Sequence, residues 1–128
     1  MRAIEEKIID CLRKSDFLSD DYDYYEQKKI LSPRDSMTLQ KKQKRVYLHG
    51  NCIFTVDREN NIKFSCQGWQ TSTTKSRINA LLSVFYCPAW IYQKNGRMVF
   101  HSSAGEFPVD SDKIYTVENG KPEEAESI

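Results

Sequence analysis

The residues best suited to chemistry lie at the start of a predicted helix. The segment Thr73-Thr74-Lys75-Ser76-Arg77 offers hydroxyls and two cations, and it contains no acid. Free backbone N–H groups and the helix dipole make such a position favourable for negative charge, so cations are misplaced there. A bound anion would reverse that cost by using the amides, the hydroxyls and both cations together. The segment therefore predicts a phosphate site, with an ordinary solvated helix start as the alternative.

Basic residues are concentrated in the middle of the chain. Residues 41–101 carry ten Lys/Arg and two Asp/Glu, whereas both flanking segments are net acidic, so the net charge of +1 conceals a strong segregation. Such a chain should present a basic face unless its own acidic ends fold back over it. Cations next to exposed aromatic residues are typical of nucleic-acid-binding surfaces. We predict that a polyanion or a charged protein partner is contacted by Arg45, Lys63, Trp69, Thr73, Thr74, Lys75 and Arg77.

Cysteine and histidine side chains could form a metal site if Gly50-Asn51 closes a tight turn. His49, Cys52 and Cys66 would then lie in one row across three strands, and Cys87 could supply a fourth ligand. Their spacing matches no zinc-binding pattern. The absence of a CxxC pair favours reduced, buried cysteines in a reducing cytoplasm. We therefore expect neither a metal nor a cofactor.

Four residues of the central region could take part in acid–base or nuclease chemistry. They are His49, His101, Asp57 and Glu59, and no GxSxG, HExxH, P-loop or paired-histidine motif accompanies them. His101 should lie opposite Trp90 in a hairpin, which suits packing. We expect a protein that is not an enzyme, with a small nuclease-like enzyme as an alternative.

The N-terminal segment reads as helical. Apolar residues recur at helical spacing over residues 2–14. Ser32-Pro33-Arg34-Asp35 is typical of a helix start, with a serine cap and proline in the first turn, and predicts a helix to about Lys42. We therefore expect residues 1–44 to form an N-terminal helical segment.

After residue 45 the periodicity changes to that of strands. A turn over residues 57–61 indicates a hairpin in which Val56 faces Ile62 and Phe54 therefore faces Phe64. In the preceding segment, Gly50-Asn51 either closes a three-strand meander or forms a bulge in one longer strand. The predicted strands are Val46–Leu48, Cys52–Val56 and Ile62–Cys66.

The rest of the chain completes an α+β pattern. An apolar stripe predicts an amphipathic core helix at about residues 74–85, and Asn95-Gly96 predicts a two-residue turn between two further strands. We expect a small antiparallel sheet of two hairpins, or a meander and a hairpin, packed on that helix. This α+β core would span residues 45–118, and the acidic residues 119–128 would form a disordered tail.

One set of motifs resembles a known group of proteins. The similar segments are Tyr47-Leu48-His49-Gly50-Asn51, Gly68-Trp69-Gln70-Thr71, Thr73 to Leu82, and Ile91-Tyr92-Gln93-Lys94. Together they resemble short proteins of unassigned function that are encoded by bacteriophages and prophages. The resemblance covers roughly residues 45–100 and supplies no catalytic residues. It implies a small accessory protein that acts stoichiometrically on host nucleases, polymerases or CRISPR-type defence complexes.

These observations lead to one functional expectation. We expect a phage-type inhibitory or accessory protein that binds a nucleic acid or a nucleic-acid-handling host complex, most specifically an anti-CRISPR or other anti-defence protein. A nucleotide-sequestering module is the other alternative. The first residues lack the apolar core of a signal peptide, and no apolar run is long enough to span a bilayer. We therefore place the protein in the cytoplasm of the host bacterial cell.

Overall fold

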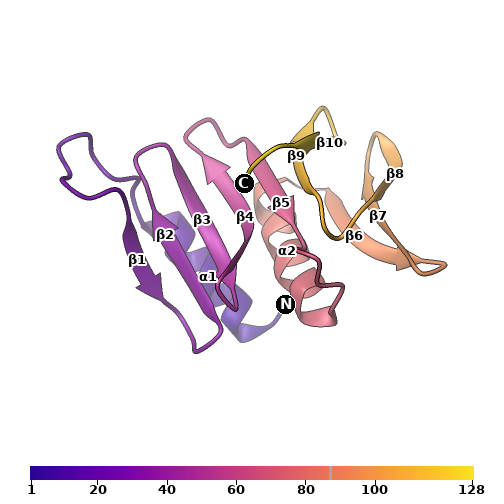
Figure 1. Cartoon of the computed structure of the whole chain (residues 1–128), viewed down its shortest axis with the longest axis horizontal. Coiled ribbons are helices and arrows are strands. Elements are labelled where there is room, and N and C mark those ends of the chain that lie inside the picture. The colour runs from indigo at the N-terminus through magenta and orange to yellow at the C-terminus, as the bar shows by residue number, and fades with distance from the viewer. Residues whose placement is uncertain (87) are drawn as a thin grey trace.

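The computed structural model describes residues 1–86 and 88–128. Within these residues the chain forms two helices and ten strands, and the strands make up a seven-stranded and a three-stranded antiparallel sheet (Figure 1). The order of the larger sheet is β1-β2-β3-β4-β5-β9-β10, and that of the smaller is β6-β7-β8. The predicted α+β class is confirmed.

The N-terminal segment is helical only at its beginning. The helix α1 (Ala3–Lys14) buries Ile8 and Leu12, as its periodicity predicts. The prediction of a second helix is wrong, because the chain forms β1 (Gln27–Ile30) and β2 (Asp35–Leu39), which pair antiparallel.

The helix-start signal at Ser32 serves a tight turn instead. The Ser32 hydroxyl accepts hydrogen bonds from the backbone N–H groups of Arg34 and Asp35, both at 3.0 Å. A helix cap makes similar local bonds, but here Met37 and Leu39 alternate into the core and the chain continues as a strand.

Strands β3 (Gln43–Leu48), β4 (Asn51–Asp57) and β5 (Ile62–Ser65) form a meander. The predicted pairs of Phe54 with Phe64 and of Val56 with Ile62 are confirmed. The first turn lies at His49-Gly50, whose φ angles are 52° and 79°, and not at Gly50-Asn51. A register shift between Val46 and Tyr47 adds a bulge next to this turn.

The helix α2 (Ser72–Phe85) packs its Ile78, Leu81 and Leu82 into the core, as predicted. It leads into β6 (Ala89–Lys94), β7 (Arg97–Ser102) and β8 (Gly105–Val109). The predicted turn at Asn95-Gly96 is confirmed by two positive φ angles and by the pairing of the residues on either side. The rings of Phe64 and Phe100 stack at 5.7 Å and connect the two sheets.

The expectation of a disordered acidic tail is wrong. Strands β9 (Ile114–Glu118) and β10 (Lys121–Ala125) form a hairpin at the edge of the larger sheet. The Gly120 N–H donates to the Tyr86 hydroxyl at 2.8 Å, and Lys113 pairs with Glu124 at 2.8 Å. These contacts, together with the ladder of backbone hydrogen bonds, hold a segment whose composition alone suggests disorder.

The larger sheet has one covered face and one open face. Both helices lie on the same side of it (Figure 1). Lys44 points to that side, because its Nζ donates to the carbonyl of Leu12 in α1 and to that of Ser15 directly after the helix. Since side chains alternate along a strand, Arg45 points to the opposite, open face. In the described residues, no helix is long and apolar enough to cross a membrane.

Candidate functional site

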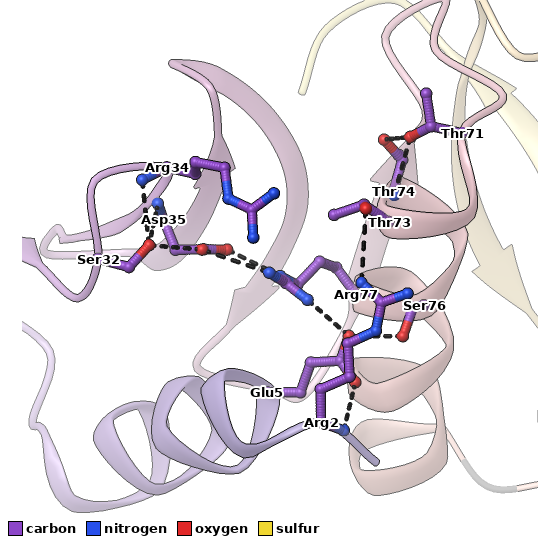
Figure 2. A network of polar contacts seen from close by, with 10 residues as sticks. All are labelled: Arg2, Glu5, Ser32, Arg34, Asp35, Thr71, Thr73, Thr74, Ser76 and Arg77. Carbon is purple, nitrogen blue, oxygen red and sulfur yellow. Dashed lines mark hydrogen bonds and ion pairs between the residues drawn. The ribbon is translucent and has the colours of Figure 1, made fainter.

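Arg77 lies in the protein interior and not at the surface of the helix start. Its side chain is 1% exposed and lies between two carboxylates (Figure 2). Its Nε donates to Asp35 Oδ1 and its Nη1 donates to Glu5 Oε2, each at 2.8 Å. Asp35 comes from β2 and Glu5 from α1, so the guanidinium joins three elements that lie far apart in the sequence. A buried charge is tolerated because it is paired in this way, and Arg77 is thus not positioned to meet an anion.

The two carboxylates are held in their charged form. Burial acts to raise the pKa of both groups, but hydrogen bonds outweigh it and leave each pKa below its ordinary value. Glu5 accepts from Ser76 Oγ at 2.6 Å and from the Arg2 N–H at 3.0 Å, in addition to Arg77. Asp35 accepts from Arg77 and from Ser32 Oγ at 2.7 Å. The cluster therefore stabilises the fold as an ionised network.

The remaining groups at the start of α2 are also partly used within the protein. Thr71 is the helix cap, and its Oγ1 accepts from the Thr74 N–H at 3.2 Å. The Thr74 side chain is buried, and Thr73 Oγ1 accepts from Arg2 Nη1 at 3.4 Å (Figure 2). Lys75 Nζ donates to Gln93 Oε1 at 3.0 Å. Thr73 and Thr74 still line a pocket, whereas Lys75 is directed towards β6.

That pocket has a volume of about 470 Å³ and lies next to the start of α2. Leu48, Ile53 and Cys66 give it an apolar lining, and His49, Asn51 and Thr71 add polar groups. Trp69 also lines it, with 59% of its surface exposed. The pocket thus brings together the predicted residues Trp69, Thr73 and Thr74.

A constrained loop presents Trp69. Gln67 and Gly68 both have positive φ, at 53° and 82°, and turn the chain sharply after β5. The Trp69 N–H donates to the Cys66 carbonyl at 2.9 Å, and the Gly68 N–H donates to the Ser111 carbonyl at 2.7 Å. Gln67 Nε2 adds a bond to the Cys52 carbonyl at 2.8 Å. The exposed indole is therefore carried by a fixed backbone.

The hypothetical metal row is not assembled. His49 lies in the turn, and Tyr47 instead of His49 lies opposite Cys52. Cys87 lies outside the described residues, and among those described no three potential ligands are grouped to hold a metal ion. Burial raises the pKa of the Cys66 thiol to about 11, so this side chain is a neutral thiol at pH 7.

The histidine and acidic candidates for catalysis are dispersed. His101 lies opposite Trp90, as predicted, and stacks on its ring at 4.3 Å. Asp57 accepts hydrogen bonds from the backbone N–H groups of Glu59 and Asn61, which shape the turn between β4 and β5.

The basic segment does not form a uniform basic face. Several of its cations bind backbone carbonyls, such as Lys41 on Asp20 and Arg58 on Leu18 and Lys41. The acidic ends of the chain supply further partners, as Glu5 and Asp35 do for Arg77. Glu106 likewise pairs with Lys94 at 3.5 Å. The alternative in which the acidic ends fold back onto the basic centre is thus realised in part.

Arg45 and Lys63 lie apart from the pocket, on the open face of the larger sheet. The Arg45 guanidinium lies 5.6 Å from the centre of the Tyr47 ring, and Lys63 Nζ donates to the Ser127 carbonyl at 3.0 Å. The predicted residues therefore divide into a pocket group (Trp69, Thr73 and Thr74), an open-face pair (Arg45 and Lys63), Lys75 directed towards β6 and the buried Arg77. One signal for Arg77 was available in the sequence, because it precedes Leu81 by one helical turn and shares the core-facing stripe.

Comparison with known proteins gives one match. Residues 1–119 match the family model described as Kyanoviridae Gp96 protein, a phage-encoded family of unknown function. No curated protein and no solved structure matches the chain. The match confirms the resemblance to phage proteins and extends it to the N-terminal 44 residues, which the shared motifs did not include. The chain belongs to the Kyanoviridae Gp96 protein family.

Proposed function

We propose that this phage protein acts by binding and engages a nucleic-acid-handling protein complex of its host. An anti-CRISPR or other anti-defence role is the most specific form of the proposal, in which the protein acts stoichiometrically in the host cytoplasm, without a cofactor and not as an enzyme. The observation that carries the proposal is the exposed Trp69 at the pocket beside α2.

An exposed tryptophan on a fixed loop is well suited to a protein interface. Tryptophan is among the residues that contribute most to binding when they become buried at the centre of an interface. The backbone bonds at Gly68 and Trp69 restrict the loop before any partner binds. The loop therefore loses little conformational entropy when a partner binds, and this favours high affinity.

The composition of the pocket supports a protein partner over a polyanion at this position. Its lining is mostly apolar, with a few polar groups such as His49 and Asn51 at hand to fix orientation. The two cations of the helix start are directed elsewhere, Arg77 to buried carboxylates and Lys75 to Gln93. A polyanion would thus find little positive charge in the pocket itself.

Affinity capture from a lysate of the cyanobacterial host tests the proposal. The full-length protein is used as bait with and without nuclease, next to Trp69→Ala and Trp90→Ala. Trp90 is the matched control, since it is also a partly exposed tryptophan, at 42%, but stacks on His101 in the smaller sheet. We expect a host protein that survives nuclease treatment, is lost with Trp69→Ala and is kept with Trp90→Ala. The proposal is contradicted if both variants capture the host protein equally well. It is also contradicted if both lose the host protein equally although circular dichroism shows that both are folded.

Nucleotide sequestration is the second candidate function. The first turn of α2 contains no acidic residue, and the pocket combines its hydroxyls with an indole on which a base could stack. Thermal stabilisation by mono- or cyclic nucleotides but not by oligonucleotides would favour this function. This stabilisation should disappear in Trp69→Ala. If no nucleotide shifts the melting temperature, nucleotide sequestration is excluded.

A further inference from the structure

The open face of the larger sheet carries a straight row of cations. Strand register pairs Lys28 with Thr38, Thr38 with Arg45, Arg45 with Thr55, and Thr55 with Lys63. We call these five residues the cation row. Cations and threonines alternate from β1 to β5, so successive cations are two strand spacings apart, about 10 Å. A single face thus carries three evenly spaced positive charges, which are separated by two buried threonines.

The three charges of the row are not neutralised by the protein. Among the described residues, no carboxylate forms an ion pair with Lys28, Arg45 or Lys63. The bond from Lys63 to the Ser127 carbonyl leaves its charge intact, because a carbonyl is neutral. The first acid along the same line is Glu123, which lies two strands beyond Lys63.

Two polar atoms in the centre of the row have no partner. Thr38 Oγ1 and Arg45 Nε are buried, and neither has a partner within hydrogen-bond distance in the described part of the chain, although the side chains of Tyr47 and Cys52 lie close to Thr38 and Arg45 respectively. Thr38 is 2% exposed, and it is the cross-strand neighbour of Arg45. Buried polar groups without a partner are rare because each loses its hydrogen bonds to water. Both groups can donate, so an anionic oxygen is the kind of acceptor that would satisfy them.

The surroundings of Arg45 favour a ligand that carries both a phosphate group and an aromatic ring. Tyr47 lies on the same face of β3, with its ring 5.6 Å from the guanidinium. Cys52 lies opposite Tyr47, and burial raises the pKa of its thiol although Arg45 acts to lower it. The thiol is therefore neutral and does not offset the charge of Arg45. Cations in line with an aromatic ring are the arrangement by which proteins bind unpaired strands, whose bases are free to stack.

We infer that the open face of the seven-stranded sheet binds single-stranded nucleic acid. A phosphate lies on Arg45 and Thr38, Lys28 and Lys63 hold the backbone on either side, and a base contacts Tyr47. The inference goes beyond the proposed function, since it uses different residues from the Trp69 pocket and assigns a second kind of partner.

Fluorescence anisotropy with the full-length protein and a labelled single-stranded oligonucleotide tests the inference. We expect Arg45→Glu to weaken binding at least about tenfold at about 50 mM salt, where phosphate contacts contribute most. The logarithm of the affinity falls as the logarithm of the salt concentration rises, and this dependence should become shallower by about 0.7 in Lys28→Glu and in Lys63→Glu, as expected for the loss of one phosphate contact with a single strand. Arg97→Glu is the charge-matched control, since it is an exposed position at the turn of the smaller sheet.

Several outcomes overturn the inference. The inference fails if the native protein binds no oligonucleotide at low salt, or if Arg45→Glu and Arg97→Glu lose the same amount of affinity. It also fails if the protein binds duplex as tightly as single strands, or if an acidic polypeptide competes for binding as well as an unlabelled oligonucleotide does. Thr38→Val is a second variant that adds no charge, and it should also weaken oligonucleotide binding. It keeps the test available if Arg45→Glu fails to fold. Capture of the host protein by Trp69→Ala and Trp90→Ala is measured separately from oligonucleotide affinity, so failure of the inference and failure of the proposed function can be distinguished.

Discussion

Two arginines of the same basic segment have opposite surroundings. Arg77 is 1% exposed and donates hydrogen bonds to two carboxylates, each at 2.8 Å in its shortest contact. Arg45 is half-buried on the open face of the sheet, where it forms no ion pair among the described residues and its Nε has no acceptor. The first charge holds the elements of the fold together, whereas the second is available to a partner.

The contrast shows that the number of cations in a segment says little about its surface. Arg77 belongs to the segment with the strongest positive charge, yet α1 and β2 bring the two acids that neutralise it. Thr38 and Arg45 are instead placed side by side by strand pairing, and among the described residues Arg45 forms no ion pair. Which cations are free is decided by the tertiary structure, through contacts between distant parts of the chain.

The largest expected effect is the loss of one carboxylate from the buried cluster. Asp35→Ala should lower the free energy of unfolding by about 3–5 kcal/mol, because it leaves a buried guanidinium only partly compensated. Urea denaturation followed by circular dichroism measures the change. Asp10→Ala is the control, since its ion pair with Lys14 is exposed and should contribute less than about 1 kcal/mol. Similar losses for both variants would remove the distinction between the buried cluster and the surface.

Acid should weaken the protein through the same cluster. Glu5 and Asp35 have lowered pKa values in the folded state, so the stability that each contributes is present above its ordinary pKa of 4.5 or 3.8. That stability is lost as the pH falls below those values and approaches the folded-state pKa. Urea midpoints measured between about pH 7 and about pH 3 should therefore fall on the acid side. In Glu5→Gln the fall should be shallower than in the native protein, and an identical slope would contradict the assignment.

A smaller loss is expected at the C-terminal end of α1. Lys44 Nζ donates to the Leu12 carbonyl at 2.8 Å and to the Ser15 carbonyl, so Lys44→Met should cost about 1–3 kcal/mol, as hydrogen bonds from a charged group do. Lys42→Met is the neighbouring control, because its side chain is exposed and should change stability little. Unfolding midpoints that shift equally for both lysines would show that the helix-end contacts are not stabilising.

The smallest effect is expected at Thr38. Thr38→Val removes a buried hydroxyl that has no partner, so the free energy of unfolding should stay the same or rise slightly. Thr74→Val should instead cost about 1 kcal/mol, because that hydroxyl is bonded to Thr71 at 3.0 Å. Thermal melts of the two variants measure the difference, and a clear loss in Thr38→Val would mean that its hydroxyl is already satisfied within the protein.

Local patterns in the sequence predicted the parts of the fold that depend on neighbouring residues. The alternation around Phe54 and Phe64 predicted the register of the β4–β5 hairpin, and Asn95-Gly96 predicted the turn between β6 and β7, because both signals act over a few residues. The apolar stripe of α2 was equally clear. Family membership was indicated by motifs near Trp69, although the match covers more of the chain.

The remaining features depend on contacts between distant residues. Ser32 gives the local signal of a helix cap, but the core contacts of Met37 and Leu39 decide for a strand. The tail strand β10 is acidic and contains Pro122, which is tolerated because β10 lies at the edge of its sheet. The partners of Arg77 lie 42 and 72 residues away in the sequence, so no local pattern identifies them.

The central claim is that the arginine that stabilises the fold and the arginine available to a partner are different residues. The most direct test is the free energy of unfolding of Arg77→Met and Arg45→Met, which make the same substitution at two sites and are measured together in urea. We predict a loss of about 3–5 kcal/mol for Arg77→Met, because two buried carboxylates lose their partner. For Arg45→Met we predict a change within about 0.5 kcal/mol. Comparable losses in the two variants would contradict the account.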